Sequence, residues 1–422
     1  SKFIVIGLTN GNGRKWNITN GALKEAFGDH FLDAKAYLAT EQALKDAEIT
    51  PTAQDLTDLA NGTIPTSFRV DSAHFNDAGD RLLANLVYEK LNELKYLWNS
   101  EICEVKDNKK AIWTFTSDDA LITSCEYFSS EFNRLNLRGS FAMIVKKLLN
   151  SDGSVNAGIV NRFKTIFAND NFDITNHTYN HLSPHDDPDN VELWKHEIND
   201  AQSKLEELFP GERVFTVANP LVATYDTIDG IIKENNWAAR NGKYESNTTL
   251  NYNSLSPTED EWFHLKWQHG NEYCTVESMK KWVDTAIQNR RWQLELWHGV
   301  DGEGSSPVPS DIATPYFEYV ASKKNELWIA TFNEAVQYLR EKQHATLNIN
   351  ANNSGNLEVS ITHDLPQDIF NYPLSVRTRV PADWNTVSVT QGDRSYTVAV
   401  SSRHIVYDVI PDGSTAVIEK VN

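Results

Sequence analysis

The chain has 422 residues, more than one hydrophobic core usually organises, so two or three domains are expected. Its hydrophobic content of 40% and charged content of 23% are those of a globular protein, and no run of about 18 apolar residues predicts a transmembrane segment. The 39 basic and 58 acidic side chains give a net charge of −19, which repels phosphate backbones and argues against nucleic acid as a partner.

The first part of the chain, residues 1–98, has the pattern of an α/β segment. A short apolar strand is expected at 3–6, and the turn-forming residues 9–13 follow it. Near the end of this part, one apolar stripe predicts a helix that contains Leu82, Leu83, Leu86, Val87, Leu91 and Leu94. The mostly polar residues 99–110 are interpreted as a link.

In residues 99–344, short apolar runs alternate with helical stretches. This alternation is typical of a parallel sheet, and so many units favour a barrel over an open sheet. The predicted strands are 111–116, 138–144, 171–176, 213–218, 262–266, 292–297 and 327–331. Amphipathic helices are expected at 278–289 and 332–342.

The last part, residues 345–422, changes to a period of two. Apolar and polar residues alternate in five short runs, and turn signals separate them, which predicts a small antiparallel β-sandwich. Trp384 and Tyr396 are the candidates for exposed aromatic side chains that contact a polymer. The alternative is that the sandwich is a structural cap.

Two adjacent carboxylates, Asp118 and Asp119, follow the strand at 111–116. Two like charges so close together repel each other, which raises the pKa of one of them. A cation removes this conflict when it binds one carboxylate and leaves the other as a base. The alternative is that the pair caps a helix that begins at Ala120.

Two histidines, His177 and His181, lie four residues apart. At this spacing, both imidazoles sit on one face of a helical turn and can share one metal ion. Solvated helices carry the same spacing, so the pattern alone leaves both interpretations open. Four nearby residues are interpreted as surface residues rather than as ligands: His185, Asp186, Asp187 and His196.

A third histidine, His298, ends the strand at 292–297 and is a candidate general acid, with a buried core histidine as the alternative. Another strand ends at Asn219, Pro220 and Leu221, where the proline fixes a turn that leaves backbone N–H groups for a ligand. The carboxyl ends of barrel strands meet at one face, so these side chains are expected to form one site.

An aspartate and two histidines are the open three-ligand set of a catalytic zinc, with water in the remaining position. The expected cofactor is one divalent metal ion, zinc, which lowers the pKa of that water towards about 7. Asp118 is then the base for attack of the metal-bound water on an acyl carbonyl. His298 is the acid that protonates the departing amine or alkoxide.

The order of these residues resembles that of the NodB-type polysaccharide deacetylases, carbohydrate esterase family four. The family's first motif, T-F-D-D-G, is similar to residues 116–120, its H-[ST]-x-x-H motif is met by 177–181, and its L-x-H motif is met by 296–298. The resemblance covers residues 105–342. It implies Asp118 as catalytic base, Asp119, His177 and His181 as metal ligands, and His298 as general acid.

Two motifs depart from the family pattern. Asn219, Pro220 and Leu221 stand where the family has Arg-Pro or Tyr-Pro-Tyr-Gly, so the oxyanion contact and the groove wall differ. The fourth motif is matched only loosely by residues 237–240, and Arg240 is the candidate partner of Asp118. The resemblance implies a distorted (β/α) barrel, a zinc-like ion, removal of acetyl groups from sugars, and a secreted, periplasmic or cell-surface bacterial protein.

The N-terminal part resembles a different family. Asp71 and His74 look like the D-x-x-H block of the SGNH (GDSL-like) esterases, where they are the Asp and His of a Ser-His-Asp triad. No nucleophile block precedes them. The expectation is therefore an incomplete SGNH-like segment, completed by an upstream part of the same polypeptide or kept only for packing.

The sequence thus predicts an α/β protein: a partial SGNH-like segment (1–98), a distorted (β/α) barrel of the NodB type (99–344) and a β-sandwich (345–422). The predicted function is metal-dependent deacetylation of a polysaccharide or oligosaccharide. The alternative is a non-catalytic carbohydrate-binding protein on a decayed deacetylase scaffold.

Overall fold

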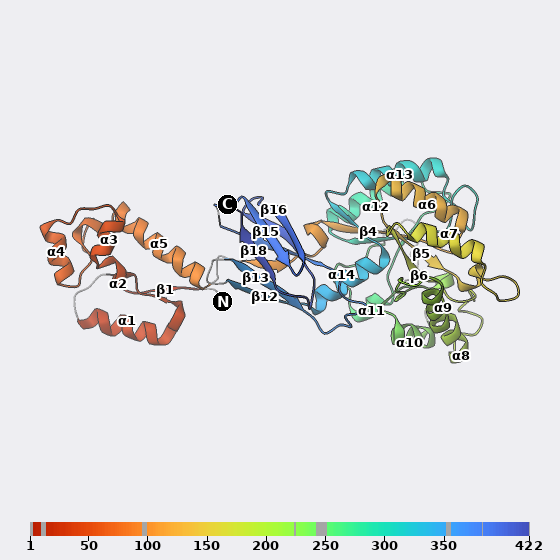
Figure 1. The fold of residues 1–422 in the computed structure, drawn as a ribbon, viewed down its shortest axis with the longest axis horizontal. Helices are drawn as coiled ribbons and strands as arrows, with labels where there is room; N and C mark the ends of the chain where they lie inside the picture. Colours follow the sequence, from red (N-terminus) through yellow and green to blue (C-terminus); the bar gives the residue numbers. More distant parts are fainter. Residues whose placement is uncertain are drawn as a thin grey trace.

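A computed structural model describes residues 3–9, 14–94, 99–222, 225–241, 251–351, 356–381 and 383–421 (Figure 1). Its centre is an eight-stranded parallel sheet in the order β8-β7-β6-β5-β4-β10-β9, with β11 also paired to β4. These strands are β4 (Ala111–Ser117), β5 (Gly139–Met143), β6 (Phe172–Asn176), β7 (Thr216–Ala218), β8 (Ala238–Arg240), β9 (Gln268–His269), β10 (Trp292–Trp297) and β11 (Leu327–Ile329).

The central sheet is open. Strands β8 and β9 end this order, and no pairing joins them in the described part of the chain, so the sheet is a curled half-barrel, which agrees with the distorted (β/α) barrel that was expected. Every residue of β4 and β10 is buried, as in a parallel sheet covered on both faces. The accompanying helices are α6 (Ile122–Leu135), α7 (Ala157–Phe167), α8 (Val191–Lys195), α9 (Ala201–Leu208), α10 (Asp226–Asn235), α12 (Val276–Asn289), α13 (Ser310–Ser322) and α14 (Phe332–His344).

One predicted strand, 262–266, is wrong. Thr258 and Glu261 form a capping box, in which each side chain accepts a hydrogen bond from the other's backbone N–H, and this starts helix α11 (Glu259–Trp262). The strand in this region is β9, which lies further along the chain. Strand β8 was not expected. Both strands are two or three residues long, too short to show a period.

Two antiparallel sheets are formed by β3, which precedes the central sheet in the chain, and by the strands that come after it. The five-stranded sheet has the order β12-β13-β18-β15-β16, and the three-stranded sheet has the order β17-β14-β3. Their bounds are β3 (Ser100–Ile102), β12 (Thr346–Ala351), β13 (Leu357–Thr362), β14 (Leu374–Arg379), β15 (Thr386–Gln391), β16 (Arg394–Ala399), β17 (His404–Val409) and β18 (Ala416–Lys420). Strand β3 lies in the segment that was interpreted as a link.

The period of two has the expected consequence in these sheets, since buried and less buried residues alternate along β13 and β15. The two aromatic candidates for polymer contact differ from expectation. Trp384 is buried, with 9% of its surface exposed, and Tyr396 is half-buried with its hydroxyl bonded to the backbone of Asp408. Neither is an exposed platform.

The N-terminal part contains a two-stranded parallel sheet of β1 (Val5–Ile6) and β2 (Phe31–Leu32). Five helices accompany it: α1 (Arg14–Phe27), α2 (Ala34–Leu38), α3 (Glu41–Asp46), α4 (Ala53–Ala60) and α5 (Asp77–Glu93). Helix α5 is the helix that the leucine stripe predicted. Of the turn cluster predicted at 9–13, residues 10–13 lie outside the described residues.

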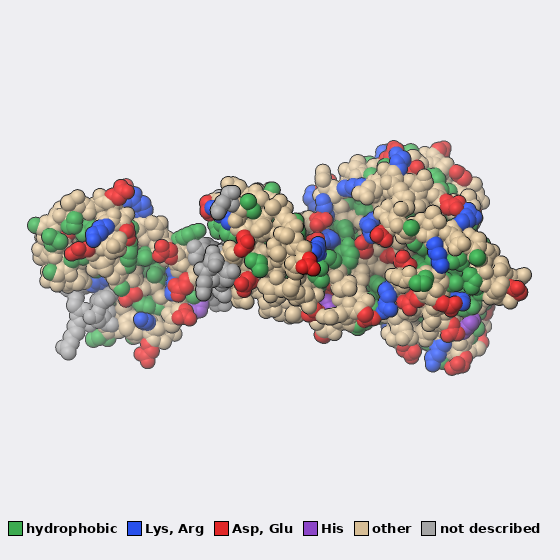
Figure 2. Space-filling model, viewed as in Figure 1, with side chains coloured by type: hydrophobic (Ala, Val, Ile, Leu, Met, Phe, Trp, Pro, Cys, Tyr) green, Lys and Arg blue, Asp and Glu red, His purple; other side chains and the backbone are tan. Residues whose placement is uncertain are grey.

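None of the described helices is long and apolar enough to cross a membrane. On the face that Figure 2 views, acidic and basic side chains are intermixed, so the net charge of −19 is not gathered there into one patch.

Candidate active site

The predicted site residues meet at the carboxyl edge of the central sheet. Asp118 and Asp119 follow β4, His177 and His181 follow β6, and His298 follows β10. All five side chains line one cavity of about 420 Å³. Parallel strands bring their carboxyl ends to the same edge, which is why residues up to 180 positions apart share this cavity.

One carboxylate and two imidazoles in this cavity are close enough to share an ion. Atom Oδ1 of Asp119 lies 3.5 Å from Nε2 of His181 and 3.7 Å from Nε2 of His177. The three ligand atoms all lie within 4.8 Å of one another. Ligand atoms of a tetrahedral zinc with bonds of about 2.05 Å are roughly 3.3 Å apart, so these side chains fit such an ion with small adjustments.

His177 is held in the form that a metal ligand needs. Its ring is buried, and Nδ1 donates a hydrogen bond to the carbonyl of Ala218 at 2.5 Å. Because a carbonyl can only accept, Nδ1 carries the proton and Nε2 presents its lone pair to the cavity. Burial, the largest effect, lowers the pKa of His177 to about 4, so the ring is neutral at pH 7.

The segment 177–181 is a loop and not the expected helical turn. Thr178 and His181 have positive φ angles of 67° and 59°, which are costly for residues other than glycine. Side chains stabilise the loop, because the hydroxyl of Thr178 accepts from the backbone N–H of His181 at 3.0 Å. The buried Glu197 accepts two hydrogen bonds from Asn180, at 2.7 and 2.8 Å.

Asp118 does not cap the next helix, which begins at Ile122 with Leu121 as its N-cap. Its carboxylate is buried against Arg240, whose Nη2 lies 2.5 and 2.6 Å from the two carboxylate oxygens. Burial would raise the pKa of Asp118, but the charge of Arg240, the largest opposing effect, and its hydrogen bonds hold that pKa below its usual range. Asp118 is therefore ionised at neutral pH.

His298 is half-buried where β10 ends, and the hydroxyl of Ser117 donates to its backbone carbonyl at 2.9 Å. The next residue must be glycine, because a Cβ on Gly299 would lie 2.2 Å from the carbonyl oxygen of Glu303. The hydrogen bond from Ser117 and the close approach of Glu303 to Gly299 therefore both constrain the backbone at His298.

The third predicted segment lies on the cavity wall. Asn219 and Leu221 line the cavity, with Pro220 between them in the chain. The side chain of Asn219 donates to Asn241 at 3.1 Å, and its backbone N–H donates to the carbonyl of Arg240 at 3.2 Å. Leu221 is 57% exposed and has a positive φ of 54°.

Three lining residues were not singled out from the sequence, namely Trp267, His269 and Ser305, and Leu296 entered only as part of the L-x-H motif. Trp267 and His269 lie two residues apart at the short strand β9, as Leu296 and His298 do at the end of β10, so the members of each pair face the same side. This W-x-H pattern beside L-x-H was the available signal, and the misplaced strand at 262–266 hid it.

The other histidines of this region lie elsewhere. His185 is exposed and its Nδ1 lies 2.8 Å from the hydroxyl of Tyr225, while His196 pairs with Asp200 at 2.8 Å. Asp186 and Asp187 are exposed, as expected for surface residues. Among the described residues, none of these four joins the group that could hold a metal ion.

Asp71 and His74 lie in the N-terminal part, apart from the central sheet, and form an exposed pair. Nδ1 of His74 is 2.8 Å from Oδ2 of Asp71. The hydrogen bond and charge of Asp71 raise the pKa of His74. No hydroxyl is hydrogen-bonded to the His74 ring among the described residues, so the pair has no serine partner here, and the SGNH resemblance stays a prediction.

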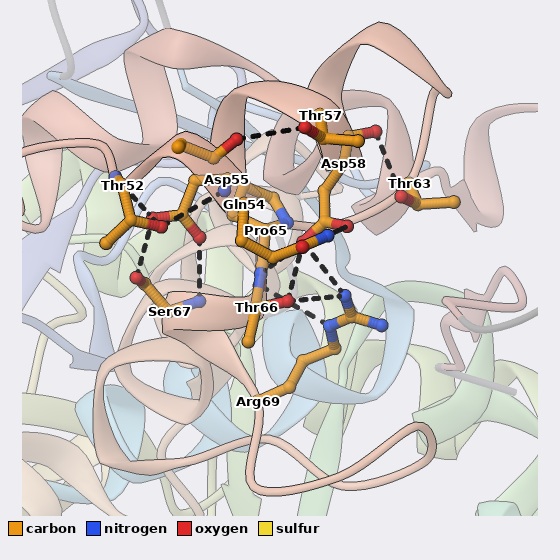
Figure 3. Close-up of polar contacts among 11 residues, drawn as sticks. Thr52, Gln54, Asp55, Thr57, Asp58, Thr63, Pro65, Thr66, Ser67 and Arg69 are labelled. Carbon is orange, nitrogen blue, oxygen red and sulfur yellow. Dashed lines mark hydrogen bonds and ion pairs between the residues drawn. The ribbon is translucent and has the colours of Figure 1, made fainter.

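A polar network holds the loop that leads to this pair (Figure 3). Asp55 accepts from the backbone N–H groups of Thr52 and Ser67, at 2.8 and 2.9 Å. Asp58 accepts from the N–H of Thr66 at 2.8 Å and pairs with Arg69 at 3.3 Å. Burial opposes ionisation of Asp55, but these hydrogen bonds lower its pKa to about 2. These contacts join residues 66–69 to helix α4 and its N-cap.

No protein-family model matches the chain. A curated protein described as gellan lyase, from Bacillus sp., is 20% identical over 339 residues, which are 76% of this chain and 13% of that protein. The chain therefore spans only a small part of the length of this relative.

Several solved structures align with about half of the chain. A peptidoglycan deacetylase from Bacillus subtilis is 15% identical, with 57% of this chain and 96% of that chain covered and a TM-score of 0.35. A family 4 carbohydrate esterase from Streptomyces lividans is 13% identical over 52% and 91%, with a TM-score of 0.33. A pseudoenzyme of carbohydrate esterase family four from Bacillus anthracis is 12% identical over 54% and 66%, with a TM-score of 0.35. TM-scores this low do not show the activity of the chain.

Proposed function

We propose that the chain is a divalent-metal-dependent hydrolase that removes acetyl groups from a polysaccharide or oligosaccharide. One observation carries this proposal. A carboxylate and two imidazoles with facing ligand atoms share a cavity with a second carboxylate, which a buried arginine keeps ionised, and with a third histidine. Histidines with a structural role and acidic residues of the surface would not be expected to share one cavity in this arrangement.

The metal ligands in this proposal are Asp119, His177 and His181. A divalent ion bound there would polarise an acyl oxygen and lower the pKa of a bound water. One carboxylate with two imidazoles suits zinc better than magnesium or calcium, which prefer oxygen ligands throughout. The fixed Nδ1–H of His177 and the constrained loop at His181 support this assignment.

Two groups are proposed to move protons. Asp118 is the base, since Arg240 keeps its carboxylate ionised and leaves it able to accept a proton. His298 is the acid that donates a proton to the departing amine or alkoxide. A mechanism of this kind serves both amide and ester bonds.

The cavity wall fits a small acyl group. Trp267 and Leu296 are buried apolar residues on this wall, and they suit the methyl of an acetyl group. Arg240 lies over the ring of Trp267, at 5.3 Å from its centroid, so the residue that holds the base also fixes this wall. The net charge of −19 favours a neutral or basic glycan over an anionic one.

The test is acetate release from acetylated xylan, from chitooligosaccharides and from a small acetyl ester, with and without EDTA. The proposal predicts release that EDTA abolishes and that Asp118→Asn lacks, while the control His185→Ala retains it because His185 lies outside the cavity. A protein that binds these glycans without releasing acetate, and that carries no divalent ion after native purification, would be the non-catalytic binding protein instead.

A further inference from the structure

A fourth histidine, His269, lies against His298 in the same cavity. The two ring centroids are 5.7 Å apart and the ring planes meet at 67°, an edge-to-face contact. His269 belongs to β9 and His298 follows β10, and both rings line the cavity. The proposed chemistry assigns His269 no role.

The backbone fixes the position of His269. It stands opposite Leu296 in the parallel pairing of β9 and β10, and Leu296 and His298 lie on the same side of their strand. The N–H of Gly270 donates to the carbonyl of Leu296 at 2.9 Å. A Cβ on Gly270 would lie 2.6 Å from the indole of Trp297, so only glycine lets the two strands approach this closely.

The ring of His298 has few other constraints. Its Nδ1 is buried and makes no hydrogen bond within the described residues, and Ser117 holds only its backbone carbonyl. A histidine that transfers protons usually has its other ring nitrogen oriented by a carboxylate or a carbonyl. Here the imidazole of His269 packs edge-to-face against the ring.

We propose that His269 is a positioning residue, whose ring fixes the orientation of the His298 ring so that Nε2 faces the departing group. The contact is an edge-to-face packing of two rings, so the proposal requires the shape of the His269 ring. This proposal rests on the proposed function, in which His298 is the general acid.

Leaving groups of different strength separate this role from a general loss of structure. A sugar alkoxide needs a proton from the acid as it departs, whereas 4-nitrophenolate does not. His269→Ala should lower kcat/KM for an acetylated sugar about 10- to 100-fold, the usual range for a residue that orients another, and leave 4-nitrophenyl acetate within about threefold. His269→Phe, which keeps a ring in place, should restore most of the loss. The control His185→Ala should change neither rate.

Three results would overturn the proposal. A His269→Phe variant as impaired as His269→Ala would show that His269 acts through a polar contact. Equal losses on both substrates would show a role in the structure of the whole site. A rise in KM alone for the sugar would show direct contact with the substrate.

A measurement without turnover keeps this proposal separate from the proposed function. In protein labelled with ¹⁵N-histidine, the ring resonances of His298, assigned by their loss in His298→Asn, should shift or broaden in His269→Ala and return in His269→Phe. If the wild type hydrolysed neither substrate, the proposed function would fail. An unchanged His298 spectrum in His269→Ala would then refute the positioning role on its own.

Discussion

The pair of Arg240 and Asp118 should be one of the strongest electrostatic couplings in the chain. Both side chains are almost fully buried, at 1% and 4% exposure, and Nη2 contacts both carboxylate oxygens. With charges roughly 4 Å apart and an effective dielectric constant of about 20, their attraction is about 4 kcal/mol. Removing one partner of a buried pair costs about 3–5 kcal/mol, because the other charge stays buried and uncompensated.

A double-mutant cycle with Arg240→Met, Asp118→Asn and both together measures this coupling. We expect a coupling energy of about 2–4 kcal/mol at pH 7, from urea unfolding curves followed by tryptophan fluorescence in EDTA. The pKa of Asp118 in the folded protein lies below its unfolded value of about 3.9, so this stabilisation is complete above that pH. It should be lost as the pH falls through the lower, folded value.

A matched exposed pair gives the control. Glu126 and Arg162 are also joined by two short hydrogen bonds, at 2.6 and 2.7 Å, but their side chains are 44% and 46% exposed. The cycle with Glu126→Gln and Arg162→Met should show a coupling close to zero, since water screens the charges. Equal couplings in the two cycles would refute the idea that burial makes the Arg240 contact strong.

Three further predictions follow from single side chains. Asp118→Asn should abolish acetate release and keep the metal, as measured by elemental analysis; loss of the metal instead would mean that the two aspartates have exchanged roles. His181→Ala should lose bound metal in the same analysis, whereas His185→Ala should keep it. Burial raises the pKa of Glu341 to about 8, so the folded protein holds a proton that the unfolded chain releases above about 4.5, and stability should fall as the pH rises between these values. Glu341→Gln should reduce this fall by on the order of 3–5 kcal/mol, so that the melting temperatures at pH 6 and pH 9 move closer together; an unchanged difference would count against it.

Much of the fold was predictable where the strands were long. The apolar runs at β4 and β10 form strands that are buried on both faces. A continuous apolar run of this kind can be recognised in the sequence. The alternation along β13 and β15 predicted sheets with one buried face in the same way. Strands β8 and β9 were missed because two or three residues carry no period, and the apolar residues near Trp262 belong to a capped helix and the core around it.

The candidate site was predictable in its members but not in its geometry. Spacing and order singled out Asp118, Asp119, His177, His181 and His298, and the structure places all five around one cavity. Their catalytic roles stay predictions. The sequence could not show that His177 and His181 approach through a strained loop, because positive φ angles at Thr178 and His181 depend on contacts with distant residues such as Glu197. It pointed only weakly to Arg240, which is 122 positions from its partner.

The most direct test of the central claim is metal restoration. Metal-free protein should release no acetate from an acetylated glycan, and activity should rise in proportion to added zinc until one ion is bound per chain. His181→Ala should need far more zinc for the same recovery. Acetate release that continues undiminished in the metal-free protein would contradict the account.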